Sequence, residues 1–206
     1  MKKIKIITAL LLVCLFFAGC TLSLQNQPTR EERQQDLTPK LIDASSVGTV
    51  DELVSAVKPA VVGIFAQSGY MQSIGTGVAV KPNGYVLTNN HVIEDATLIR
   101  LYLSNGTTSN ATLVWKDSSA DIAILKSDVE LPYLPMADEN SYSSGDEVIA
   151  IGTPLALAFK HTTTKGIISA LNRTIQVDTD YGTSTLNNLI QHDASINPGN
   201  SGEDHW

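Results

Sequence analysis

Short runs of β-branched and aliphatic residues, separated by turn residues, dominate the chain from residue 60 onward. Gly, Pro and Asn mark the breaks, as in Pro82-Asn83-Gly84 and Ser104-Asn105-Gly106. Many strands at short spacing, with no amphipathic segment of helical length between them, predict an all-β barrel or sandwich and disfavour a doubly wound α/β fold. The expected strands cover residues 60–66, 77–80, 84–88, 97–103, 111–115, 121–126, 147–152, 163–171, 174–178 and 188–193.

The segment 127–145 interrupts this pattern with two prolines and a cluster of polar residues. It is the natural seam between two halves, 48–130 and 131–206, of a single domain that spans 48–206.

A short helix is expected at the start of that domain. Thr49 and Glu52 have the spacing of a capping box, Leu53 and Val57 fall on one face, and Pro59 ends the segment.

The N-terminal residues 1–20 have the features of an export signal: three lysines, then an apolar run, then Ala18-Gly19 before Cys20. The run is shorter than the roughly 20 residues that span a bilayer, so an uncleaved anchor is disfavoured. The small-small-Cys ending looks like the lipobox of bacterial lipoproteins, which predicts a lipid on Cys20; secretion without lipid is the other alternative. Residues 21–47 are polar, lack a sustained apolar period and are expected to form a tether.

Composition and charge narrow the class of protein. The 206 residues are 43% hydrophobic and 17% charged, which is typical of a globular domain. Both cysteines, Cys14 and Cys20, lie in the signal, so no intramolecular disulfide is expected after its removal. The remaining 11 basic and 21 acidic residues give a net charge of −10, which argues against nucleic acid as a partner and leaves membrane contact to the lipid.

The best candidate for a nucleophile is Ser201, in Gly199-Asn200-Ser201-Gly202. Glycine permits backbone angles that turn consecutive N–H groups toward one point, where they could stabilise an oxyanion.

A serine nucleophile needs a base and an acid that orients the base. His91 follows a predicted strand, where a side chain can face a cleft, whereas a surface, structural or terminal position is the simpler interpretation of the other three, His161, His192 and His205. Asp121 opens an apolar run, where a buried carboxylate needs a partner, and the alternative is an exposed strand-edge cap. Asp193 is the rival acid, although it could equally brace the serine loop through backbone hydrogen bonds.

Taken in order, these motifs resemble the bacterial HtrA (Deg) branch of the trypsin-like serine proteases. The resemblance covers about residues 57–202. It rests on SIGTGVAV (73–80), YVLTNNHVI (85–93), SSADIAILK (118–126), VIAIGTPLAL (148–157), TTKGIISALNR (163–173) and LIQHDASINPGNSG (189–202).

The resemblance implies a chymotrypsin/trypsin-like fold of two perpendicular six-stranded antiparallel β-barrels with the site between them. It makes His91 the general base, Asp121 the buried acid and Ser201 the nucleophile, with the backbone N–H groups of Gly199 and Ser201 as oxyanion donors. No metal or organic cofactor is implied.

The expected function is that of a serine endopeptidase acting on unfolded or misfolded envelope proteins. Ser195 and Ile196 would lie near the pocket floor, and because neither is charged, cleavage after small aliphatic residues is favoured over cleavage after Lys or Arg. No PDZ domain is expected within these residues. Relatives often form trimers, so a homo-oligomer stays open, although residues 21–47 show no pattern for such a contact.

The ending departs from the family, whose motif continues into Gly-Pro-Leu where this chain has Glu203-Asp204-His205-Trp206. We therefore expect a truncated form with an incomplete second barrel and impaired or absent activity. A specialised terminus is the alternative to truncation. The alternative functions are a non-catalytic lipoprotein of protease fold that binds unfolded chains or a partner, and a lipid-tethered adhesion module.

Overall fold

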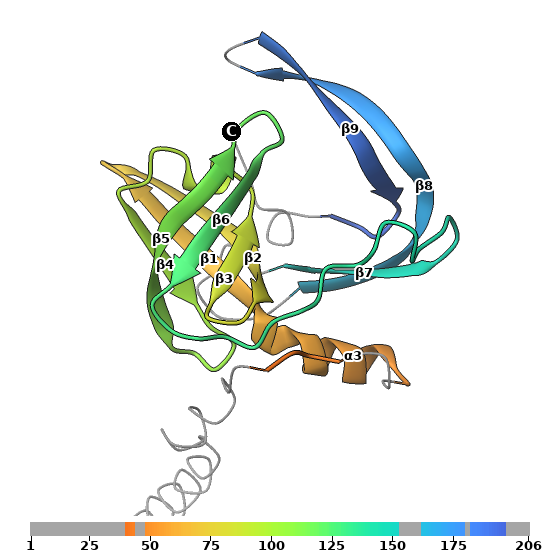
Figure 1. Ribbon diagram of the computed structural model, residues 1–206, viewed down its shortest axis with the longest axis horizontal. Coiled ribbons are helices and arrows are strands. Elements are labelled where there is room, and N and C mark those ends of the chain that lie inside the picture. The colour runs from red at the N-terminus through yellow and green to blue at the C-terminus, as the bar shows by residue number, and fades with distance from the viewer. Residues whose placement is uncertain (1–39, 44–47, 153–161, 180–181, 197–206) are drawn as a thin grey trace, which may run out of the picture. The chain divides into compact units, whose positions relative to one another are not determined.

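The computed structural model describes residues 40–43, 48–152, 162–179 and 182–196. Six antiparallel strands close into a barrel in the order β1-β2-β3-β6-β5-β4, and three further strands form a second sheet in the order β7-β8-β9. Figure 1 shows the barrel strands and the long ribbon of β8 and β9. The all-β prediction is confirmed, with one barrel closed and the second sheet partly formed.

The barrel forms where the short β-branched and aliphatic runs predicted strands. Its interior holds apolar side chains of the strands, most of them at alternate positions, among them the fully buried Ile64, Leu101 and Leu125. Burying such a side chain contributes roughly 1.5–3 kcal/mol, so these positions hold the barrel together. The barrel strands are β1 (Val61–Ser68), β2 (Met71–Lys81), β3 (Tyr85–Thr88), β4 (Leu98–Tyr102), β5 (Thr108–Asp117) and β6 (Ile122–Ser127).

The predicted helix is present as α3 (Val50–Val57), followed by the 3₁₀ turn η1 (Lys58–Ala60). Its capping box is complete: the Glu52 backbone N–H donates to Thr49 Oγ1 at 3.3 Å, and the Thr49 N–H donates to Glu52 Oε2 at 3.2 Å. Two N–H groups that a helix start leaves unpaired are thereby satisfied.

The second sheet consists of β7 (Glu147–Gly152), β8 (Thr162–Thr179) and β9 (Gly182–His192). The sequence predicted two strands, 163–171 and 174–178, where the structure has the single strand β8. The break at Asn172 is absorbed by register shifts against β9 between Ile168 and Ile175, and Asn172 itself has φ +54. A β-bulge allows a strand to continue past a residue that does not pair regularly with the neighbouring strand. The composition around Asn172 is typical of a turn, so the sequence alone predicted a break there.

Residues 40–43, assigned to the polar tether from the sequence, pack against the barrel. Ile42 is buried, its N–H donates to the Tyr133 carbonyl at 2.9 Å, and Leu41 forms a parallel bridge with Tyr133. Leu131 is also fully buried in the core. The first residues of the expected seam therefore belong to the barrel, so its packing extends past residue 130.

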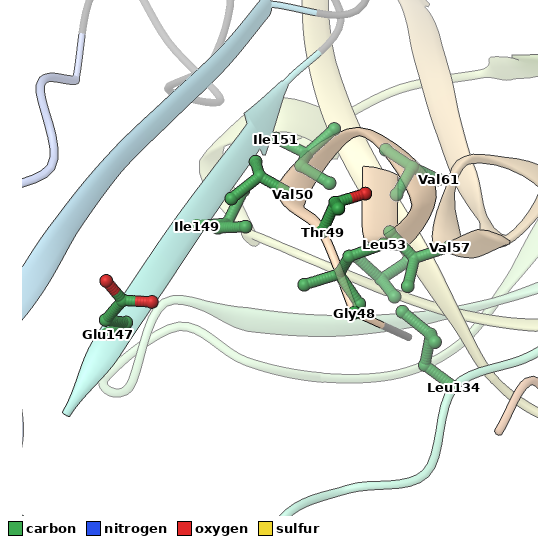
Figure 2. Close-up of a pocket in the computed structure, with 11 residues that line it drawn as sticks. Gly48, Thr49, Val50, Leu53, Val57, Val61, Leu134, Glu147, Ile149 and Ile151 are labelled. Carbon is green, nitrogen blue, oxygen red and sulfur yellow. The ribbon is translucent and has the colours of Figure 1, made fainter. Parts of the chain in front are cut away.

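A cavity of about 600 Å³ lies between α3, the barrel and β7. Figure 2 shows the side chains around it: Val50, Leu53 and Val57 come from α3, and Ile149 and Ile151 come from β7. Glycine and threonine at positions 48 and 49 and the carboxylate of Glu147 add the polar part of its lining.

Within the described ranges, no helix has the length and apolarity needed to cross a membrane.

Candidate active site

The register between β3 and β6 brings His91 and Asp121 together. Thr88, the last residue of β3, pairs with Ala123 near the start of β6. Since the strands are antiparallel, the residues after Thr88 lie beside those before Ala123, and the N–H of Asn90 donates to the Asp121 carbonyl at 3.2 Å. Two residues 30 positions apart thus leave the barrel at the same edge.

His91 opens the 3₁₀ turn η2 (His91–Ile93). The next two residues, Val92 and Ile93, are buried in the barrel core and anchor this turn. The His91 backbone is therefore held by packing, while its side chain stays 28% exposed.

Asp121 lies in a turn rather than in the strand, with φ +53. Asp tolerates this left-handed region better than most residues with a Cβ, because its short polar side chain can bond locally. The turn is held by Asp117, whose Oδ1 accepts from the Ser119 N–H at 2.9 Å, the Ser119 hydroxyl at 2.6 Å and the Ala120 N–H at 3.2 Å. These bonds, led by the Ser119 hydroxyl, lower the pKa of Asp117.

His91 and Asp121 form a hydrogen-bonded pair. His91 Nδ1–H donates to Asp121 Oδ2 at 2.7 Å, and the His91 backbone N–H donates to Oδ1 at 2.9 Å. The resemblance predicted a buried acid, but the Asp121 side chain is 33% exposed, because its turn lies at the barrel edge. The carboxylate fixes the tautomer with the proton on Nδ1, which places the lone pair of Nε2 on the far side of the ring, as a general base requires.

The remaining histidines and the rival acid lie elsewhere. His192 is exposed at the end of β9, and His161 and His205 lie outside the described residues. Asp193 does not contact His91 in any described interaction: its Oδ1 accepts from the Ile167 N–H at 2.7 Å. It braces the segment before Ser201 against β8, across 26 positions of sequence rather than locally.

Gly199 and Ser201 also lie outside the described residues, as does Cys20. Ser195 and Ile196 are described and exposed, and neither lines the cavity beside α3. The Ser195 carbonyl accepts from Thr164 Oγ1 at 2.7 Å, which gives the segment a second attachment to β8. Across the part of the chain that is described, no cluster of three or more His, Cys, Asp or Glu residues could hold a metal ion.

Three residues that support the site were not among the residues predicted from the sequence: Asn89, Asp117 and Gly166. Asn89 Nδ2 donates to Asp121 Oδ2 at 3.0 Å. Gly166 leaves room for the backbone of Ala194, which a Cβ added at this position would overlap. The Asp-x-Ser spacing before Asp121 is a sequence signal for the turn. The roles of Asn89 and Gly166 depend on contacts with residues far away in sequence, which no local pattern reveals.

Comparisons with known proteins agree with the fold. The family model for the trypsin-like peptidase domain matches residues 75–202. The chain therefore belongs to the trypsin-like peptidase family, the class that the closed barrel and the His–Asp pair define. Within that class it is a protease homologue of HtrA/Deg type, as the following relatives show.

Serine protease Do-like HtrB of Bacillus subtilis (strain 168) is 38% identical over 205 residues, covering 86% of this chain and 44% of the relative. A probable periplasmic serine endoprotease, DegP-like, of Pseudomonas savastanoi pv. phaseolicola is 43% identical over 132 residues, covering 64% of this chain and 26% of the relative. The solved structure of the HtrA-type protease AlgW with a tripeptide has a TM-score of 0.62 and 39% identity, covering 72% of this chain and 47% of that one. The chain thus spans less than half the length of each of these relatives.

Proposed function

We propose that this chain carries the catalytic machinery of a serine endopeptidase, with His91 as general base, Asp121 as its orienting acid and Ser201 as nucleophile. The observation that carries the proposal is the His91–Asp121 pair, joined at 2.7 Å through Nδ1, which leaves Nε2 as the nitrogen that can take up a proton. The family match extends over Ser201. The backbone N–H groups of Gly199 and Ser201 are the proposed donors to the oxyanion.

The proposed substrates are unfolded or misfolded polypeptides of the cell envelope. Two observations support the location: residues 1–20 have the pattern of an export signal, and relatives from Pseudomonas and Rickettsia are named periplasmic endoproteases. Cleavage after small aliphatic residues is proposed, because Ser195 and Ile196 bring no charge to the segment before the nucleophile.

A fluorophosphonate probe tests the nucleophile directly in the full 206-residue chain. Because impaired activity is expected from the sequence, we expect slow and incomplete labelling confined to Ser201, no label in Ser201→Ala, and strongly reduced labelling in His91→Ala. Ser68→Ala, in a barrel strand, is the matched control and should be labelled like the unaltered chain. Cleavage of unfolded casein that depends on Ser201 would extend the result from nucleophile to endopeptidase.

The same experiment decides against the proposal if the folded chain takes up no label. Binding of unfolded casein without labelling or cleavage would then support the non-catalytic alternative. Intact barrel signals in an amide NMR spectrum show that the chain tested is folded.

We further propose that Cys20 carries a lipid that tethers the chain to the membrane. The two cysteines offer a matched pair, since both lie in residues 1–20. Radiolabelled palmitate should be incorporated into the unaltered chain and into Cys14→Ala but not into Cys20→Ala. Equal incorporation in both variants would rule out lipidation at Cys20.

A further inference from the structure

Asn89 is a polar residue beside the His91–Asp121 pair to which the Ser-His-Asp scheme gives no role. Its Nδ2 donates to Asp121 Oδ2 at 3.0 Å and to the Asp121 carbonyl oxygen at 3.2 Å. Oδ2 is also the oxygen that accepts from His91 Nδ1. One neutral amide group therefore contacts both the backbone of Asp121 and the carboxylate oxygen that faces His91.

The His91 backbone N–H holds Asp121 Oδ1 at 2.9 Å, and Asn89 adds a contact to the other carboxylate oxygen and to the Asp121 backbone. The Asp121 backbone is at φ +53, and the Asp121 side chain is one-third exposed. An exposed carboxylate can rotate about its Cα–Cβ bond and replace a protein donor by water, and that freedom is lost only when other contacts hold it. The carbonyl and Oδ2 lie at opposite ends of this torsion, so a group that bonds to both of them fixes it.

The position of Asn89 follows from the strand register. It is the first residue after β3, next to the Asn90 N–H that extends the ladder to Asp121. A side chain at this point reaches Asp121 across the barrel edge without a long loop. Asn suits the position because it supplies N–H donors with no charge, whereas Asp would set a second carboxylate against the first.

We infer that Asn89 is a positioning residue that keeps the Asp121 carboxylate in line with His91 Nδ1 and so fixes the tautomer of His91. The effect on the imidazole concerns the barrel alone, and only its catalytic consequence rests on the proposed function. Asn89 touches neither substrate nor the reacting serine in this assignment, and it acts through Asp121.

The test follows His91 by NMR in the full chain with ¹⁵N-labelled histidine. In the unaltered chain, we expect His91 to carry its proton on Nδ1, with the far-downfield proton signal of a hydrogen bond to a carboxylate. In Asn89→Ala and in the isosteric Asn89→Asp, that signal should broaden or disappear, and the Nε2-protonated tautomer should rise about fivefold to tenfold. Asn89→Asp keeps the shape of the side chain and carries the test if Asn89→Ala fails to fold.

A matched control is available in Asn140, whose Nδ2 donates to Asp138 Oδ1 at 3.3 Å on the exposed surface, in the same kind of Asn–Asp contact. Asn140→Ala should leave the His91 signals unchanged. Unchanged His91 signals in both Asn89 variants would overturn the inference, and so would an equal loss in Asn140→Ala.

A kinetic readout separates positioning from a general effect on stability. Asn89→Ala should slow fluorophosphonate labelling of Ser201 about tenfold with an unchanged thermal midpoint, and with a substrate it should lower kcat more than it raises KM. If the unaltered chain takes no label, the protease proposal fails, while the tautomer measurement still decides the role of Asn89. Labelling at the unaltered rate in a folded Asn89→Ala chain would overturn the catalytic consequence.

Discussion

Gly166 in β8 is the position where adding one methyl group should have the clearest effect on the segment that leads to Ser201. A Cβ there would overlap the backbone nitrogen of Ala194 and Asp193 Oδ1, and would lie 2.7 Å from Ala194 Cα. Two of these atoms belong to the main chain, so no side-chain rotation relieves the overlap. Gly166→Ala must therefore push the segment 193–195 away from β8.

The free-energy cost of this shift follows from the hydrogen bonds that it would break. Asp193 Oδ1 accepts from the Ile167 N–H at 2.7 Å, the Asp193 N–H donates to the Ile167 carbonyl at 3.3 Å, and Thr164 Oγ1 donates to Ser195 O at 2.7 Å. At about 0.5–1.5 kcal/mol each, their loss costs roughly 2–4 kcal/mol, with the lower end favoured because these groups are exposed and can bond to water instead.

Native-state hydrogen exchange measures this cost at the Ile167 amide. About 2–3 kcal/mol corresponds to exchange that is roughly 30- to 150-fold faster in Gly166→Ala. Gly48→Ala is the control, since the nearest atom to its added Cβ is Glu52 Oε2 at 3.8 Å, and a change below about 0.5 kcal/mol is expected. Unchanged exchange at the Ile167 amide in Gly166→Ala would show that the segment 193–195 does not depend on contact with β8.

Three further outcomes are expected from the barrel and its turns. Ser119→Ala should raise the pKa of Asp117 toward its ordinary value of 3.8, measured by ¹³C NMR titration; because the pKa is lowered in the folded chain, the stabilisation by the carboxylate is complete above that value and disappears as pH falls through the folded pKa. Leu125→Ala should lower the free energy of unfolding in urea by about 2–5 kcal/mol, whereas Leu113→Ala, at a 43% exposed position, should cost well under half as much. Thr49→Ala should cost about 1 kcal/mol through the lost helix cap, while Thr49→Ser should not.

Local patterns predicted much of this fold because short β-branched runs form the barrel strands, most of which alternate between a buried and a more exposed face. The runs at 84–88 and 121–126 became β3 and β6 within one or two residues, and the capping-box spacing at Thr49 became α3. The period-2 pattern is strong where one face is buried, as in β4, whose residues alternate exposed and buried. Secondary structure of this kind depends on residues close together in the sequence, so it can be predicted from the sequence alone.

The parts that could not be predicted depend on contacts across the fold. The continuity of β8 through Asn172 requires bulges set by the register with β9. The packing of Ile42 requires Tyr133, some 90 residues further along the chain. Motif order pointed to His91 and Asp121, yet only the register of two strands revealed that Asn89 lies with them.

The His91–Asp121 pair is supplied entirely by the closed barrel, and this has a consequence for the order in which the protein is made. All the barrel's strands and the buried Leu131 precede residue 135, so the pair's whole supporting framework is translated before the remaining 67 residues up to Ser201. At roughly 5–20 residues per second, that interval lasts about 3–13 s. A growing chain can thus have every residue that holds the His91–Asp121 pair several seconds before residue 201 is added.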